Sequence, residues 1–371
     1  MKIAILGTRG IPNNYGGFEQ FAEYISTGLT KKGHEVTVYN PHFHPYKEDT
    51  FCGVNIKRCY SPEHLIGASA NFLYDYLCLK DALKHNFDII YEAGYHSNAP
   101  SYSLLKNKKR PILITNMDGL EWKRSKWNKI TCILIKYLEK LAVKKTHYMI
   151  ADNIGIQMYY KDKYKVDPFF IAYGADHVDD FLESDLNQFN VAAHKYFLVI
   201  SRLEPENNIE PILDGYISSK STIPFLVIGN NETKYGLELI QKYANSGIHF
   251  AGSVYDKSIL DNLRHFSLGY FHGHSVGGTN PSLLEAMASR CLIIAHNNIF
   301  NISVMKKGGI YFETSSDISK IINNTPLQNL PYRRKYITLN LKEVAKNYSW
   351  QGIIDQHEAL FIQLINDNKS L

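Results

Sequence analysis

Several signatures that would narrow the function are missing from this chain of 371 residues. Its five cysteines are scattered singly with no Cys-x-x-Cys pair, which argues against a disulfide framework or a zinc ribbon and favours reduced thiols. No dense Lys/Arg tract accompanies a nucleic-acid-binding motif, so we expect no nucleic-acid partner. The formal net charge of +5 favours anionic ligands or an acidic membrane surface instead.

Long apolar segments are also absent. No run of about 18 apolar residues occurs, and the N-terminus enters a predicted strand, Lys2–Leu6, with no apolar leader before it. These absences predict a cytoplasmic protein that is either free or peripherally attached to a membrane.

Two cofactor classes are disfavoured as well. No Asp-x-Asp pair occurs, although enzymes that hold a sugar diphosphate through a divalent cation generally need one, and His272-x-His274 has no further ligand at zinc-like spacing. The turn after the first strand is not G-x-G-x-x-G, and the second strand ends in Tyr39-Asn40 instead of the acidic residue that would hold an NAD ribose. We therefore expect no metal and no NAD.

What the sequence does contain is an alternation of short apolar runs and helical patterns, which is typical of parallel sheets covered by helices. One series starts at Lys2–Leu6, a polar segment (Asp176–His194) reads as an interdomain linker, and a second series follows. The pattern predicts an α/β protein with two doubly wound domains, residues 1–176 and 190–348, and a final helix within residues 349–371. Ligands are expected in a central cleft at the carboxyl ends of the strands.

A glycine-rich turn follows the first strand, between Gly7 and Gly17. Glycine lets backbone N–H groups approach a phosphate, and the N-terminus of the next helix adds positive potential. We assign Gly16 and Gly17 to a phosphate-bearing donor; the alternative is a plain strand-to-helix turn. Tyr15 in the same turn and His96 are assigned to the acceptor.

A second glycine-rich loop lies in the second domain, after a strand that ends at Phe271. Gly278, Thr279 and Asn280 would offer backbone amides to a diphosphate at the N-terminus of the following helix. Glu285, placed near that helix's first turn, would accept hydrogen bonds from the hydroxyls of a ribose. The alternative for Glu285 is an acid that compensates the helix dipole.

Three further side chains follow predicted strands. Arg202 is a candidate for binding the diphosphate, because guanidinium matches phosphate bidentately, or it is a surface arginine. Asp118 would orient or deprotonate an acceptor hydroxyl, or it forms an Asx turn before Gly119. Trp122 would stack on a sugar ring of the acceptor, or it packs.

The helix predicted over Lys129–Lys145 carries an apolar stripe at i, i+3, i+4 spacing that we expect to be core. The stripe consists of Ile130, Ile133, Leu134, Tyr137, Leu138, Leu141 and Ala142. The lysines and arginine around it form either a solvated face or a contact with anionic lipid head groups.

These motifs resemble the family-4 glycosyltransferases of GT-B fold, particularly a bacterial polysaccharide rhamnosyltransferase-like branch. The resemblance rests on three blocks in the same order: residues 5–19 (Ile-Leu-Gly-Thr-Arg-Gly-Ile-Pro-x-x-Tyr-Gly-Gly-Phe-Glu), residues 118–124 (Asp-Gly-Leu-Glu-Trp-Lys-Arg) and residues 274–287 (His-Ser-Val-Gly-Gly-Thr-Asn-Pro-Ser-Leu-Leu-Glu-Ala-Met). The segment Tyr348-Ser-Trp350 and the helix after it resemble the family's closing helix, which crosses back to the first domain.

The resemblance implies metal-independent transfer with retention of configuration, with Gly17 and Arg202 on the donor phosphates and Glu285 on its ribose. It places Asp118 near the reacting sugar. Two positions depart from the family pattern: Asn207 stands where a lysine is usual, and Gly277 replaces the first glutamate of a paired-glutamate motif. We keep Asn207 in the donor site and expect Arg202 and backbone amides to neutralise more of the phosphate charge.

The function expected from this sequence is a glycosyltransferase. It would move rhamnose from dTDP-rhamnose, or the sugar of a UDP-sugar, to a growing, lipid-linked glycan in bacterial cell-surface polysaccharide synthesis. The rivals are a nucleotide-sugar epimerase of the same fold, a non-catalytic nucleotide- or glycan-binding protein, and, less favoured, an NAD oxidoreductase.

Overall fold

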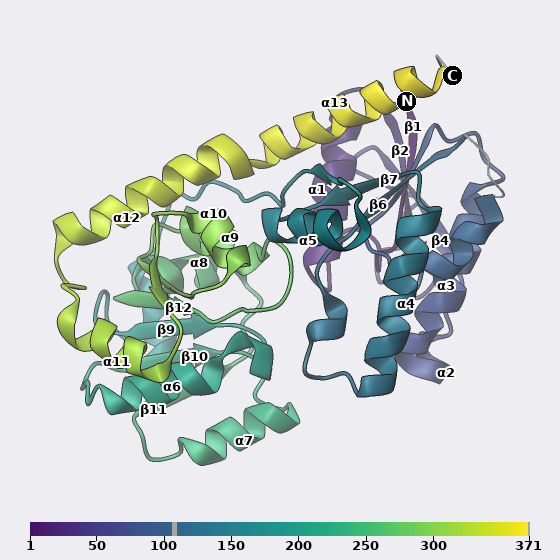
Figure 1. The fold of residues 1–371 in the computed structure, drawn as a ribbon. Coiled ribbons are helices and arrows are strands. Elements are labelled where there is room, and N and C mark those ends of the chain that lie inside the picture. The colour runs from purple at the N-terminus through teal and green to yellow at the C-terminus, as the bar shows by residue number, and fades with distance from the viewer. Residues whose placement is uncertain (106–109, 370–371) are drawn as a thin grey trace. The chain divides into compact units, whose positions relative to one another are not determined.

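The structure, a computed structural model, describes residues 1–105 and 110–369. The chain forms two compact units (Figure 1). Unit 1 joins Met1–Tyr173 with the final helix, which begins at Trp350, and unit 2 is Gly174–Ser349. The chain therefore leaves unit 1, builds unit 2 and returns to unit 1 with its last helix.

In the described part of unit 1, the strands form an 8-stranded sheet in the order β3-β4-β2-β1-β5-β6-β7-β8. The strands are β1 (Lys2–Leu6), β2 (Glu35–Pro41), β3 (Thr50–Phe51), β4 (Val54–Cys59), β5 (Ile89–Glu92), β6 (Ile112–Asn116), β7 (Tyr148–Ala151) and β8 (Phe169–Phe170). Neighbouring strands pair in parallel except β3 and β4. β5 and β6 are buried along their whole length, because helices cover both faces of a parallel sheet.

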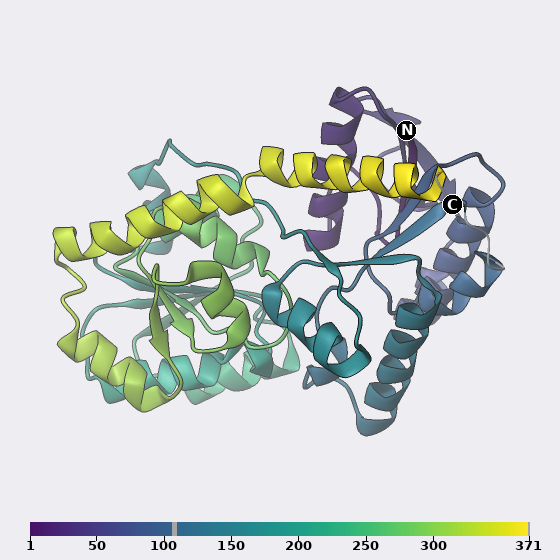
Figure 2. The ribbon, with the colours of Figure 1, turned by 45° about the horizontal axis from the view of Figure 1, so that its top comes forward.

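The helices of unit 1 are α1 (Gly17–Lys31), α2 (Glu63–Ile66), α3 (Ala70–Ala82), α4 (Lys129–Lys145), α5 (Ile154–Tyr164) and α13 (Trp350–Lys369). α13 crosses over α1 in both views, and the two helices are in contact (Figures 1 and 2). Trp350 stacks on Tyr24 with ring centroids 4.2 Å apart. A Cβ at Gly28 would come within 2.4 Å of Ile354, so glycine lets the two helices approach closely.

Unit 2 has a 6-stranded, all-parallel sheet in its described residues, in the order β11-β10-β9-β12-β13-β14. Its strands are β9 (Phe197–Ile200), β10 (Phe225–Ile228), β11 (Ile248–Gly252), β12 (Gly269–His272), β13 (Ile293–His296) and β14 (Ile310–Phe312). Its helices are α6 (Ile209–Ser218), α7 (Lys234–Lys242), α8 (Lys257–His265), α9 (Pro281–Ala288), α10 (Ile299–Met305), α11 (Ser315–Asn324) and α12 (Leu330–Glu343). Across residues 1–105 and 110–369, no helix is both long enough and apolar enough to cross a bilayer.

The predicted linker, Asp176–His194, is not an open connection. It belongs to unit 2 and contains a 3₁₀ segment, Glu183–Phe189, whose Leu186 and Phe189 are buried. Asn262 Nδ2 donates to Asp185 Oδ2 over 2.6 Å and fixes this segment to α8. Two buried apolar residues in a polar segment are too few to produce a helical or strand periodicity. The sequence of this segment therefore resembles that of a linker.

The prediction that the whole apolar stripe of α4 is core was wrong. The helix buries Ile135, Leu138, Glu139 and Ala142. Four of its other apolar side chains, Ile130, Ile133, Leu134 and Tyr137, are exposed by 80%, 69%, 49% and 61%. The helix has apolar residues on two faces, and periodicity alone does not tell which face meets the sheet.

Candidate functional site

Each sheet has one point where the strand order reverses: between β1 and β5 in unit 1, and between β9 and β12 in unit 2. Ligands of open parallel sheets bind beyond the carboxyl ends of the strands at such a point. The predicted site residues all follow strand ends. Tyr15, Gly16 and Gly17 follow β1, His96 follows β5, Asp118 and Trp122 follow β6, Arg202 and Asn207 follow β9, and residues 278–285 follow β12.

In unit 2 the structure joins two of these segments directly. Asn207 Oδ1 lies 2.9 Å from His274 Nδ1, and Asn208 Nδ2 donates to Gly273 O over 2.7 Å. The amide of Ser275 donates to Glu206 O over 3.0 Å. These hydrogen bonds hold the loops after β9 and β12 together where the strand order reverses, although Asn207 and His274 are 67 positions apart in the sequence.

Asn207 itself is buried, and both polar atoms of its side chain are used within the protein. Its Nδ2 donates to Arg202 O over 2.8 Å, while its Oδ1 meets His274. This arrangement favours a role in shaping the two loops over the direct donor contact that the sequence suggested. Arg202 differs: its side chain is 58% exposed, and the nearest carboxylate, that of Glu204, is 3.9 Å away. Its guanidinium can still bind an anion.

The loop before α9 leads into the N-terminus of that helix. Asn280 caps α9 by accepting the Ser282 amide over 2.9 Å, and Pro281 opens the helix. In the described residues, the N–H groups of Gly278 and Asn280 donate to no protein acceptor. Two donors beside a helix N-terminus suit an anionic oxygen.

Gly277 explains one departure from the family pattern. Its φ is +133°, and a Cβ there would lie 3.1 Å from His274 Nε2. L side chains rarely adopt this backbone region, so a glutamate at position 277 would strain the loop. In this conformation the loop does not accommodate a glutamate at position 277 without strain.

Glu285 is the fifth residue of α9 and lies just beyond the first turn, where an acid would compensate the helix dipole. Its side chain is 20% exposed, and Oε2 accepts from Arg264 Nη2 over 2.7 Å. Arg264 is 1% exposed and also donates to Asp261 Oδ1 over 3.0 Å and to Ser282 Oγ over 3.1 Å. A buried, forked guanidinium thus fixes the orientation of Glu285.

Arg264 was not predicted from the sequence. The only local signal was the i, i+3 pair that it makes with Asp261 on α8, whereas its contact with Glu285 spans 21 positions.

Two histidines, His272 and His274, lie at the end of β12 and in the loop after it. Burial holds the pKa of His272 well below its usual value, and its Nε2 is buried without a hydrogen-bond partner in the described structure. The ring centroids of His272 and His274 are 6.2 Å apart. No group of three or more His, Cys, Asp or Glu in residues 1–105 and 110–369 is placed to hold a metal ion. Metal independence stays a prediction.

In unit 1, Asp118 follows β6 and forms a side-chain hydrogen bond with Asp152, which follows the neighbouring strand β7. Two hydrogen-bonded carboxyl groups share a proton. Burial raises the pKa of Asp118; Arg124 opposes the rise and Glu121 adds to it. Asp152 was not predicted, although its position after the next strand of the same sheet edge was a usable signal.

The segment after Asp118 is an ion-paired turn. Glu121 binds Arg124 Nε over 2.7 Å and Lys126 Nζ over 3.0 Å, and it accepts from Trp127 Nε1 over 3.0 Å. Burial opposes the charge of Glu121, but Arg124, His96 and Lys126 hold its pKa below the usual value. The turn therefore keeps a fixed anion near Asp118.

The predicted acceptor residues differ in what their side chains already contact. Burial lowers the pKa of His96 to about 4, and its Nε2 is buried with no hydrogen-bond partner in the described part of the chain. Trp122 Nε1 donates to the buried Glu139 over 3.0 Å, which favours packing. Tyr15 is 67% exposed, with the Arg9 guanidinium 3.8 Å from its ring centroid.

Gly16 and Gly17 open α1, but a carboxylate already occupies that helix end. Glu19 is 3% exposed and accepts the Arg9 amide over 2.8 Å, and the Gly16 amide also donates to it. Burial raises the pKa of Glu19. A phosphate at Gly16–Gly17 would face this carboxyl group, so unit 1 offers a poorer anion site than the loop before α9.

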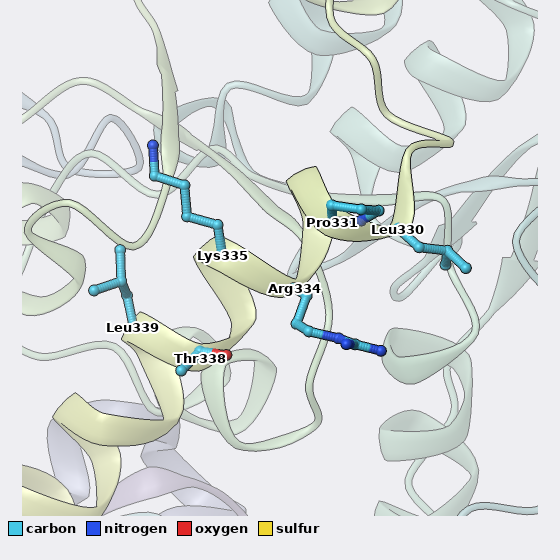
Figure 3. A pocket seen from close by; sticks show the side chains of 6 residues that line it. All are labelled: Leu330, Pro331, Arg334, Lys335, Thr338 and Leu339. Atoms are coloured by element: carbon cyan, nitrogen blue, oxygen red, sulfur yellow. The ribbon is translucent and has the colours of Figure 1, made fainter.

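A hollow of about 550 Å³ lies elsewhere in unit 2 (Figure 3). Its lining comes from α12 alone: Leu330, Pro331, Arg334, Lys335, Thr338 and Leu339. The hollow is a surface groove along one helix and not part of the strand-end site.

Comparison with known proteins supports this architecture. Residues 1–176 match the family described as "Domain of unknown function (DUF1972)". The chain is 22% identical to the uncharacterized glycosyltransferase MJ1069 of Methanocaldococcus jannaschii, covering 99% of both proteins.

Among solved structures, it is similar to a sucrose-phosphate synthase from Thermosynechococcus elongatus (14% identity, 99% of each chain, TM-score 0.76). It is also similar to Alr3699/HepE of Anabaena in complex with UDP and glucose (17% identity, 98% of this chain and 100% of that chain, TM-score 0.74). The predicted fold class is confirmed: the chain has a GT-B-type glycosyltransferase fold, α/β with a parallel sheet in each of two domains.

Proposed function

We propose that this protein is a glycosyltransferase that uses a nucleoside-diphosphate sugar. The observation that carries the proposal is the joined pair of loops after β9 and β12. Between them they supply amides at Gly278 and Asn280, the exposed guanidinium of Arg202 and an oriented carboxylate at Glu285. These are groups that fit a diphosphate and a ribose.

The reaction breaks the anomeric C–O bond while a nucleoside diphosphate leaves. Negative charge builds on the diphosphate, so donors fixed in advance at its position lower the barrier. The amides of the loop before α9 and Arg202 would supply that stabilisation without a metal ion. This assignment keeps Gly278, Thr279, Asn280 and Arg202 as donor-binding residues.

The orientation of Glu285 bears on the nucleotide. Arg264 occupies Oε2 and leaves Oε1 and the outer lone pairs for hydroxyl donors. A ribose offers two adjacent hydroxyls to such a carboxylate, whereas the deoxyribose of dTDP offers one. Of the two donors expected from the sequence, a UDP-sugar therefore fits this site better than dTDP-rhamnose.

Unit 1 would bind the acceptor. Asp118 is proposed as the group that takes or orients the acceptor's proton, because burial raises its pKa towards neutrality, where a general base works best. His96, with a buried ring nitrogen free to accept a hydroxyl, is a stronger acceptor-binding candidate than Trp122 or Tyr15. Retention of configuration is part of the proposal and follows from the family resemblance.

Other proteins support the class of donor. Alr3699/HepE has been solved with UDP and with UDP-glucose, and the Methanocaldococcus jannaschii relative is named a glycosyltransferase. The acceptor is proposed to be a growing, lipid-linked glycan in bacterial cell-surface polysaccharide synthesis, with the enzyme peripherally bound to the inner membrane face.

The test is a calorimetric titration of purified protein with UDP and dTDP in EDTA. We expect UDP to bind at sub-millimolar concentration, with dTDP weaker. The variant E285Q should weaken UDP about 10–100-fold, as expected for loss of charged hydrogen bonds, and dTDP less. E238Q, an exposed glutamate on α7, is the matched control. Failure of both nucleotides to bind the native protein would overturn the proposal.

A further inference from the structure

α4 is a helix of unit 1 that carries apolar residues on two faces. One face rests on the unit through Ile135, Leu138 and Ala142. The other carries the exposed stripe, defined as Ile130, Ile133, Leu134 and Tyr137, with exposures from 49% to 80%.

The exposed stripe is continuous. Its members stand at positions i, i+3, i+4 and i+7, so their side chains lie next to one another over two turns of the helix. Single exposed apolar residues are ordinary on protein surfaces, whereas a contiguous group at helical spacing indicates a surface that meets another apolar phase.

The charges on α4 have one sign. Lys129, Lys136 and Lys140 are exposed on the helix, and no carboxylate among residues 1–105 and 110–369 forms an ion pair with them. The only acid in the helix sequence, Glu139, is 0% exposed. It turns inward and is neutralised by Lys163 at 2.9 Å, with Tyr159, Tyr164 and Trp122 also donating to it. The exposed side of α4 therefore carries an apolar stripe, and its exposed charged residues are all lysines.

A second copy of the chain is a poor occupant for this surface. Symmetric pairing would bring the same lysines together, and a stable interface needs roughly 20–30 residues a side, far more than these four. A nucleic acid would leave the aliphatic side chains in water. A bilayer rich in anionic lipid satisfies both features, since lysines reach phosphate head groups while Ile, Leu and Tyr enter the acyl boundary.

We propose that the outer face of α4 docks the protein on an anionic phospholipid bilayer. The helix follows Asp118 by way of the Glu121–Lys123 turn and is capped by Asn128, whose Oδ1 accepts the Thr131 amide over 2.9 Å. The docking surface thus belongs to the same unit as the proposed acceptor side. It would bring that unit to a lipid-linked saccharide, but lipid binding does not depend on sugar transfer.

The test is co-sedimentation of the full chain with vesicles, with no sugar donor present. Native protein should bind vesicles made of equal parts phosphatidylcholine and phosphatidylglycerol, bind phosphatidylcholine alone much less, and lose binding at high salt. A variant with Ile130, Ile133, Leu134 and Tyr137 all changed to Ser should bind at least about tenfold more weakly. Replacing Lys129, Lys136 and Lys140 with Gln should cost about fivefold for each lysine removed.

The matched control carries L237S and Y255S, two exposed apolar positions of unit 2. All variants should keep the native melting temperature, because the changed side chains are exposed. The proposal is overturned if native protein binds neither vesicle or if the four-serine variant binds as native protein does. It is equally overturned if native protein is a dimer that this variant makes monomeric, because a second copy then covers the stripe. Absence of transferase activity would leave these outcomes unaffected.

Discussion

The carboxyl edges of the two sheets share a topology but have opposite chemistry. In unit 1 the groups gathered there are carboxyls: Glu92 at the end of β5, Asp118 after β6 and Asp152 after β7. In unit 2 the same place holds free amides and the guanidinium of Arg202. In a parallel sheet, the point where the strand order reverses provides a binding site. The residues that follow the strands decide whether this site suits proton transfer or the binding of an anion.

Further buried carboxyl groups lie in unit 1, and we call them, together with the carboxyls at the strand ends, the acidic edge. Glu92 is 0% exposed, accepts from Asn98, and has its pKa raised well above the usual value by burial. Asp75 on α3 hydrogen-bonds Ser97, and burial raises its pKa to about 7. These raised pKa values leave less negative charge at this edge than its composition suggests, so the edge repels a diphosphate less but attracts none.

The variant D118N tests most directly whether the two sheet edges have different chemical roles. We expect turnover to fall by about 10²–10⁴-fold, the usual contribution of general acid–base catalysis, while the dissociation constant of UDP stays unchanged. In native protein, turnover should rise with pH as Asp118 loses its proton, with a midpoint above the ordinary range of an aspartate. Nucleotide release at saturating donor measures the first effect and calorimetry the second. If D118N turns over at the native rate, the carboxyl groups of unit 1 take no part in catalysis.

A second test concerns stability. The pKa of Asp75 rises from 3.8 to about 7 on folding, so the native state holds a proton that the unfolded chain has lost. This contribution is present at low pH and is lost as the pH rises through 7, a change of roughly 4 kcal/mol between pH 4 and pH 8. D75N should remove most of that pH dependence.

Urea unfolding of native protein and D75N at pH 5 and pH 8 measures it. D162N, at an exposed position on α5, is the control. Parallel pH dependence in native protein and D75N would contradict the buried proton.

The smallest effect is expected at the basic edge. R202M should weaken UDP about tenfold, since an exposed guanidinium contributes a charge-assisted contact that solvent partly screens. R202K should recover part of the loss, because a lysine keeps the charge but not the bidentate geometry. If both variants bind UDP as native protein does, the amides before α9 hold the diphosphate by themselves.

Local patterns in the sequence predicted the two series of strands, the glycine loop before α9 and the position of Glu285 beside it. They could not predict Arg264 or Asp152, because each acts through a contact with a residue far away in the chain. They also assigned the exposed apolar face of α4 to the core, because the apolar residues of this helix are regularly spaced on both of its faces. Nothing in the sequence near Gly16 showed that Glu19 turns back onto the helix end.

The return of the chain to unit 1 makes unit 2 an insertion whose two ends meet. Ala175 and Ser349 form a β-bridge, and the Ala175 amide donates to Tyr348 O over 2.7 Å. A module with adjoining ends can be excised, exchanged for that of a relative or circularly permuted without threading the rest of the protein. Unit 1 lacks this freedom: cut after Tyr173, it would lose α13 and uncover the side of α1 that Trp350 and Ile354 now fill.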